Sequence, residues 1–136
     1  MEYKIEYKTT DDIESILNLN ERKPTIQFPE FYGTVYDGSL LIGVMLIFEI
    51  RPGCFAFPYR YIKEEYRKNR IGEELYRFCC IELMKLPRFE SISFKSTVKR
   101  SGWVDRRLKE GFKIVSSSDD YNVFFGEEEM LRRRFK

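Results

Sequence analysis

Apolar and polar residues along the first half of the chain follow mainly the period-two pattern of β-strands. Residues 3–7 alternate aromatic or aliphatic with charged side chains, which predicts a half-buried strand. Capping side chains at Thr10, Asp11 and Asp12 then precede apolar residues at helical spacing, which predicts a helix. Three further strands are expected at 31–36, 40–50 and 54–62, separated by turns at Asp37-Gly38 and at Arg51-Pro52-Gly53. In the last of these strands alternation predicts one shared face for Phe55, Phe57, Tyr59 and Tyr61.

The second half of the chain begins with a helical period and then returns to strands. A helix is expected to open at Gly72 and to end before Pro87. The pattern then predicts a strand at 91–97, a helix at 103–110 stopped by Gly111, and a hairpin of 112–115 with 121–125. The charged tail 127–136 is expected to be solvated, although i,i+4 pairs such as Glu128–Arg132 would also suit a helix. The order is β-α-β-β-β-α-β-α-β-β, which predicts one α/β domain.

Composition narrows the chemistry of this domain. The chain has 136 residues, a length typical of one domain, and a net charge of 24 − 22 = +2, which does not point to nucleic acid. Histidine is absent, which excludes Ser–His–Asp and Cys–His catalysis and zinc sites with histidine ligands. The cysteines, Cys54, Cys79 and Cys80, form no disulfide or CxxC pattern, so reduced thiols and no metal site are expected. Neither a signal-like N-terminus nor a membrane-length apolar stretch occurs, so we expect a soluble cytoplasmic protein.

The segment 61–75 is the most informative for function. It reads as the end of a strand, a basic stretch and a helix that opens at a glycine. A helix start presents main-chain N–H groups and the positive end of the helix dipole, and Arg67, Lys68 and Arg70 add formal charge. These features suit a phosphate-binding site, but they also suit a solvated basic loop before an ordinary helix.

The same segment resembles the acetyl-CoA signature of the GCN5-related N-acetyltransferase (GNAT) family. In that family a strand leads to Arg/Gln-x-x-Gly-x-Gly/Ala and a helix; Arg67 matches the first position, Gly72 the last, and Arg70 replaces the first glycine. The corner Leu108–Phe112 is similar to the family's helix-to-strand xLGF motif. The resemblance covers nearly the whole chain. It implies a mixed, largely antiparallel sheet of six to seven strands flanked by helices, in a single domain spanning 1–136.

The resemblance also implies an activity and a binding site. The activity is transfer of an acetyl group from acetyl-CoA to a primary amine of a small molecule or protein. Two central strands would splay apart, the pantetheine arm would lie along one of them, and helix-start amides would hold the diphosphate. The implied cofactor site comprises Arg60, Tyr61, Ile62, Arg67, Lys68, Asn69, Arg70, Ile71, Gly72 and Glu73.

The sequence departs from the family at the positions that usually carry catalysis. The tyrosine that commonly serves as the general acid is replaced by Arg107, and Arg100 and Lys95 fall near two other usual positions. An arginine cannot donate a proton at neutral pH, although its charge could stabilise a thiolate. The catalytic residues therefore stay unidentified. The replacement candidates are Tyr59, Tyr61, Glu49 and Tyr121.

A second hypothesis follows from these cations. A catalytically silent domain of the same fold would bind an acidic protein or a nucleic acid through a basic pocket, although no nucleic-acid motif is present. That pocket would be lined by Lys95, Lys99, Arg100, Arg106 and Arg107. Acceptor specificity is expected in the loops Asn20–Glu30 and Ser116–Asp120, and a homodimer through exposed terminal strands is left open.

Overall fold

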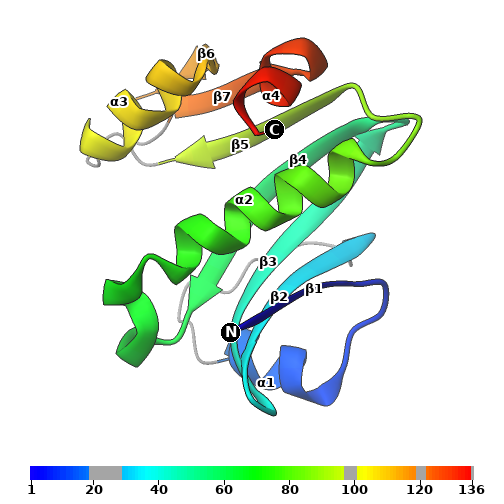
Figure 1. Ribbon diagram of the computed structural model, residues 1–136, viewed down its shortest axis with the longest axis vertical. Helices are drawn as coiled ribbons and strands as arrows, with labels where there is room; N and C mark the ends of the chain where they lie inside the picture. Colours follow the sequence, from blue (N-terminus) through cyan, green and yellow to red (C-terminus); the bar gives the residue numbers. More distant parts are fainter. Residues whose placement is uncertain (19–28, 97–100, 119–121, 136) are drawn as a thin grey trace.

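A computed structural model describes residues 1–18, 29–96, 101–118 and 122–135. In this part of the chain seven strands form one sheet in the order β1-β2-β3-β4-β5-β7-β6 (Figure 1). The strands are β1 (Glu2–Glu6), β2 (Phe31–Asp37), β3 (Leu40–Arg51), β4 (Cys54–Ile62), β5 (Ser91–Ser96), β6 (Lys113–Ser117) and β7 (Asn122–Glu127). The helices are α1 (Asp11–Asn18), the 3₁₀ helix η1 (Glu64–Asn69), α2 (Ile71–Met84), α3 (Ser101–Glu110) and α4 (Glu128–Arg134).

Strand pairing makes the sheet mixed and largely antiparallel, as the sequence predicted. All neighbouring strands run antiparallel except β4 and β5, which pair in parallel and are connected in the chain through α2. The two-residue turn after β2 forms at Gly38, whose φ of 62° suits glycine. No helix in the described part of the chain is both long and apolar enough to cross a membrane.

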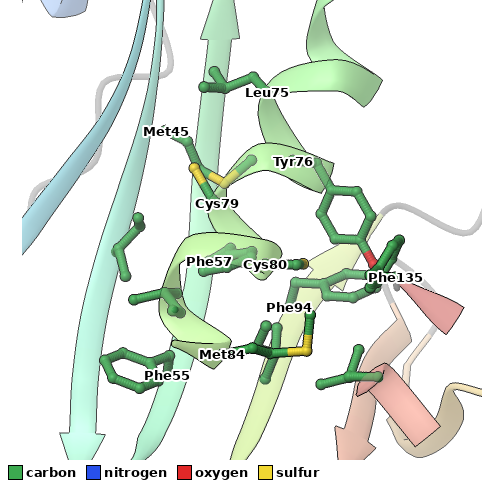
Figure 2. Close-up of a cluster of buried hydrophobic side chains, with 14 of the residues drawn as sticks. Met45, Phe55, Phe57, Leu75, Tyr76, Cys79, Cys80, Met84, Phe94 and Phe135 are labelled. Atoms are coloured by element: carbon green, nitrogen blue, oxygen red, sulfur yellow. The ribbon is translucent and has the colours of Figure 1, made fainter. Parts of the chain in front are cut away.

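Helices cover both faces of the sheet. Along β3, Met45 and Ile47 belong to the hydrophobic cluster under α2, whereas Val44 and Leu46 belong to the cluster that contains Ile13 of α1. Because adjacent strand residues point to opposite faces, the two clusters lie on opposite sides of the sheet. Figure 2 shows the larger cluster, in which α2 packs over the central strands. The alternation also explains why β3 is buried on both faces over 41–47.

The expectation of a single aromatic face on β4 is wrong. Phe55 and Phe57 belong to the cluster under α2, but Tyr59 and Tyr61 pack against the cluster on the α1 side. The register explains this change, because Leu46 pairs with Tyr59 while Phe48 pairs with Ala56. Three steps along β4 therefore match two along β3, and such a bulge moves the following side chains to the other face.

The prediction of a solvated tail is also wrong. Residues 128–134 form α4, with the predicted Glu128–Arg132 pair at 2.8 Å. Leu131 is fully buried and Phe135 nearly so, and Phe135 packs edge-on against Tyr76 with ring centroids 6.0 Å apart. The apolar residues between the charges therefore anchor this helix on α2 and the sheet.

Candidate functional site

The parallel strands β4 and β5 separate halfway along their length. Their pairing runs from Cys54–Ser91 to Phe57–Phe94 and then ends, although β4 continues to Ile62. The next residue, Pro58, has no N–H group with which to continue the ladder, and the bulge lies at the same place. In Figure 1 the end of β4 diverges from β5, which stays beside β7. The two central strands therefore splay apart beyond residue 57.

The start of α2 follows directly from this separated strand end. The helix η1 leads to Arg70, whose φ of 58° places it in the left-handed region, and α2 begins at Ile71, one residue earlier than predicted. The helical ladder opens with the bond from the Glu74 N–H to the Arg70 carbonyl, at 3.1 Å. No side chain caps this helix start. The amides of Ile71, Gly72 and Glu73 precede the ladder and point out of the helix end.

Two arginines fasten the strand end to the helix start. Arg67 donates from Nε to the Ile62 carbonyl at 2.7 Å, and its guanidinium lies over the Tyr61 ring at 5.2 Å. Arg60 donates from Nη1 to the Gly72 carbonyl at 2.9 Å. The structure thus brings the two ends of the predicted site together, since Arg60, Tyr61 and Ile62 adjoin the residues from Arg67 to Glu73.

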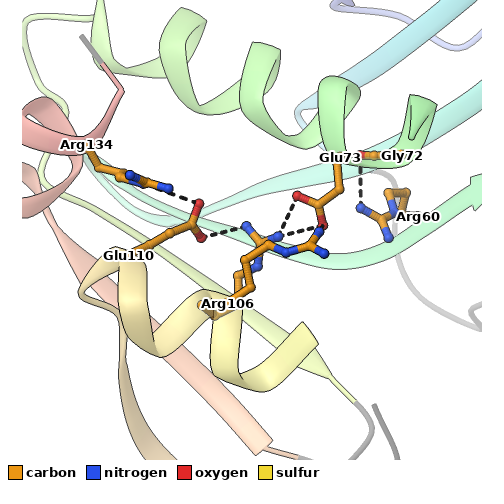
Figure 3. A network of polar contacts seen from close by, with 7 residues as sticks. Arg60, Gly72, Glu73, Arg106, Glu110 and Arg134 are labelled. Carbon is orange, nitrogen blue, oxygen red and sulfur yellow. Dashed lines mark hydrogen bonds and ion pairs between the residues drawn. The ribbon is translucent and has the colours of Figure 1, made fainter. Parts of the chain in front are cut away.

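An ion-pair cluster centred on a buried arginine joins the first turn of α2 to α3 and α4 (Figure 3). At its centre, fully buried Arg107 donates from Nη2 to the Glu73 carboxylate at 2.5 Å and from Nη1 to Glu110 at 2.7 Å. Arg106 lies 3.5 Å from Glu73, and Arg134 lies 3.8 Å from Glu110. We refer to Glu73, Arg106, Arg107, Glu110 and Arg134 as the arginine–glutamate cluster.

Electrostatics keeps the central arginine of this cluster charged. Burial by itself lowers the pKa of Arg107, but Tyr76, Glu73 and Glu110 together raise that pKa above its ordinary value. Burial raises the pKa of Glu110, and Arg107 and Arg134 oppose this rise. The Arg107 guanidinium also lies over the Tyr76 ring, 4.5 Å from its centroid. A fully buried, paired guanidinium cannot line a basic pocket, so the prediction of an open pocket wall at Arg107 is wrong.

The other candidate residues have varied surroundings. Glu49 accepts two hydrogen bonds from Arg88, which with the Gly53 N–H lower its pKa despite some burial, so this carboxylate closes the turn after β3. Tyr59 and Tyr61 lie on the separated half of β4, half-buried on the α1 side. Tyr121, Lys99, Arg100 and most of the loop Asn20–Glu30 lie outside the described residues.

Sequence reasoning missed two features of this site. Pro58 marks where the strands part, and a proline inside a predicted central strand is a signal that could have shown it. The second feature is the contact between the Glu73 carboxylate and Arg107, 34 residues away, which no local sequence pattern predicts.

Comparison with known proteins gives a result at the level of structure. No family model and no curated protein matches the sequence itself. Among solved structures, spermidine/spermine N-acetyltransferase SpeG from Vibrio cholerae superimposes with a TM-score of 0.77 at 15% identity, covering 98% of this chain and 97% of that one. A Bacillus subtilis acetyltransferase in complex with CoA gives 0.69 at 16% identity, with coverage of 92% and 97%. The ribosomal-protein-S18-alanine N-acetyltransferase from Escherichia coli gives 0.71 at 10% identity, with coverage of 93% and 94%.

The chain has the GNAT fold. The resemblance read from the sequence is confirmed at this level, from β1 to the closing hairpin of β6 and β7. Arg70, which replaces the first glycine of the signature that the sequence resembles, has a left-handed conformation.

Proposed function

We propose that residues 1–136 form one acetyl-CoA-dependent N-acetyltransferase domain that acetylates a primary amine. One observation carries the proposal: β4 leaves β5 at Phe57, and the released strand end leads into an uncapped helix start. This combination offers main-chain groups along the separated half of β4 and amides at the start of α2. The CoA complex among the structures with this fold supports the assignment.

The alternation of main-chain groups along β4 suggests how the arm of the cofactor would lie. The Lys63 N–H donates to the Ile42 carbonyl at 2.8 Å, toward β3. Main-chain groups alternate between the two edges of a strand, so those of Arg60 and Ile62 face the edge that β5 has left. Because the Ile62 carbonyl already accepts from Arg67, the pantetheine amides would use the neighbouring groups of this edge.

The diphosphate would lie at the start of α2. The amides of Ile71, Gly72 and Glu73 are the ligands, and an anion there also gains from the helix dipole, by about 0.3–1 kcal/mol when exposed. Lys68, Asn69 and Arg70 complete the rim of this site.

The reaction would depend mainly on positioning. The amine nitrogen would attack the thioester carbon and form the nitrogen–carbon bond. The carbon–sulfur bond would break, CoA would leave as the thiolate, and one proton would pass from the amine to water or a base. Proton transfer by a positioned side chain typically contributes about 10²–10⁴-fold, so activity does not require the tyrosine that Arg107 replaces. Because Arg107 is buried in the cluster, it acts neither as the acid nor as a direct partner of the thiolate.

Calorimetric titration with CoA, using Gly72→Asp, tests the placement of the diphosphate. A side chain at Gly72 would meet the Arg60 guanidinium, since a Cβ there lies 3.1 Å from Cζ, and its carboxylate would repel the phosphates. We expect at least about tenfold weaker binding. Lys85→Asp, at the other end of α2, is the matched control and should bind as the wild type does. No binding by the wild type at millimolar CoA rejects the proposal.

Release of free thiol from acetyl-CoA with a panel of primary amines tests the transfer itself. We expect thiol release that depends on one class of amine. A protein that binds CoA but releases no thiol with any amine would instead support the catalytically silent domain.

A further inference from the structure

Glu73 places a carboxylate beside the amides that the proposed function assigns to the diphosphate. With Arg70 as the N-cap residue, Ile71, Gly72 and Glu73 are the first three residues of α2. A glutamate at the third position commonly folds back onto the main-chain N–H of the N-cap residue, which here is Arg70. Its negative charge would then lie beside the amides assigned to the diphosphate and would repel a phosphate there, since charges this close are little screened.

The structure shows the Glu73 side chain turned the other way. It makes no capping bond to the helix start, and both its oxygens face Nη2 of Arg107 at 2.5 Å. Figure 3 shows that this carboxylate is directed at α3, whereas the backbone at Gly72 meets Arg60. Arg106 adds a second positive charge on Glu73 at 3.5 Å.

Two further contacts hold the Arg107 guanidinium. Glu110 binds its other terminal nitrogen at 2.7 Å, and the Tyr76 ring lies against the guanidinium at 4.5 Å. Arg134 balances the second carboxylate, so the cluster holds three arginines and two glutamates. Its net charge is therefore positive even with both carboxylates ionised.

The geometry points to Arg107 as a positioning residue that withdraws and neutralises the Glu73 carboxylate, so that the first amides of α2 stay open to the CoA diphosphate. This role rests on the proposed function and adds to it. Arg107 acts through Glu73 and touches neither the thioester nor the acceptor. The residue that replaces the family's usual acid would thus serve cofactor binding.

Removal of each partner separates this role from that of a simple structural clasp. In Arg107→Met the Glu73 carboxylate keeps only the half-exposed Arg106 as its cation and is free to turn toward the helix start, so we expect CoA affinity to fall by about tenfold. In Glu73→Gln the competing charge is gone, so affinity should equal or exceed that of the wild type. In Glu73→Gln/Arg107→Met affinity should return to within about twofold of the wild type. If the Glu73–Arg107 pair served only to link α2 and α3, Glu73→Gln would weaken that link and CoA affinity should fall.

The experiment is calorimetric titration of each variant with CoA, after circular dichroism has shown that each is folded. Arg107→Met leaves the partly buried carboxylates of Glu73 and Glu110 without their central cation and can unfold the chain. Glu73→Gln/Arg107→Met/Glu110→Gln removes these three charges together and should also bind CoA. Arg133→Met is the matched control, since Arg133 pairs only with exposed Glu129 on α4 among the contacts of the described residues.

The outcomes distinguish the two proposals. If the wild type binds CoA but Glu73→Gln binds tenfold more weakly, or the double variant binds no better than Arg107→Met, the role of Arg107 is overturned and the proposed function stands. If the wild type itself does not bind CoA, the proposed function fails and the role fails with it.

Discussion

At the residue scale, Arg70 has an unusual backbone conformation for its side chain. Its φ of 58° makes it the one residue other than glycine with positive φ in the described part of the chain. A residue with a Cβ in this region costs about 1–2 kcal/mol, whereas glycine adopts it freely. In the signature that the sequence resembles, glycine stands at this position, and glycine would adopt the conformation without that cost.

Two substitutions at Arg70 isolate this cost. Both Arg70→Ala and Arg70→Gly remove the guanidinium, but only alanine keeps the Cβ. We expect the glycine variant to have the higher free energy of unfolding, by about 1 kcal/mol, in urea denaturation. Equal stability of the two variants would contradict a left-handed residue 70.

Tyr36 links stability to alkaline pH. Burial, and then the hydrogen bond that its hydroxyl donates to Glu6 at 2.9 Å, raise its pKa from 10.0 to about 12. The unfolded chain therefore releases this proton first, so the contribution of Tyr36 is complete below pH 10 and is lost as the pH rises toward 12. In Tyr36→Phe that loss is absent. The difference in unfolding free energy between wild type and variant, measured against pH, should move in favour of the variant over this range; a constant difference would contradict the assignment.

At the element scale, the approach of α2 to β2 depends on Gly33. A Cβ at this position would collide with Sγ of Cys79, which is fully buried on α2. Gly33→Ala should therefore cost about 1–3 kcal/mol through overpacking. Cys79→Ala should relieve the collision, so the double variant should lose less stability than the sum of the two single variants.

A second glycine provides the control for this double-mutant cycle. A Cβ at Gly43 would meet Ile62 at 2.5 Å and Val35 at 2.8 Å, not Cys79. Cys79→Ala should therefore not rescue Gly43→Ala. Chemical denaturation of the six proteins measures both cycles, and additive losses at Gly33 would disprove the contact.

The helices and strands could be predicted from the sequence, but the side of the sheet to which the second half of β4 turns its side chains could not. Turn residues such as Asp37-Gly38 and Gly111, and the period of the apolar residues, are local properties, and the observed elements follow them closely. The bulge near Pro58 depends on how β4 pairs with β3, so alternation along β4 alone predicted the wrong side for Tyr59 and Tyr61.

At the scale of the whole molecule, the site combines predictable and unpredictable parts. The helix start was found from the sequence because its basic residues and Gly72 are contiguous. The environment of Arg107 was not, since its partner Glu73 is 34 residues away and its burial depends on α2, α3 and α4 together. From its position in the sequence, Arg107 was predicted to line a pocket, but the packing of the three helices places it in the interior.

The C-terminal residues connect this interior to the rest of the fold. Phe135 is 7% exposed and packs on Tyr76, which in turn lies against the Arg107 guanidinium. Arg132 also ties α4 to α2, donating from Nη2 to the Met84 carbonyl at 2.8 Å. The helix that the sequence suggested would be a solvated tail is thus one wall of the arginine–glutamate cluster.

Phe135→Ala tests this assignment of α4. Removal of a buried aromatic ring typically costs about 3 kcal/mol, and the loss should appear as a lower urea midpoint with an unchanged slope. Arg133→Ala, which breaks a pair with side chains 75% and 88% exposed, should change stability by less than about 0.5 kcal/mol. If Phe135→Ala were as stable as Arg133→Ala, α4 would not be part of the folded core, and Tyr76 would be held against Arg107 without a contribution from α4.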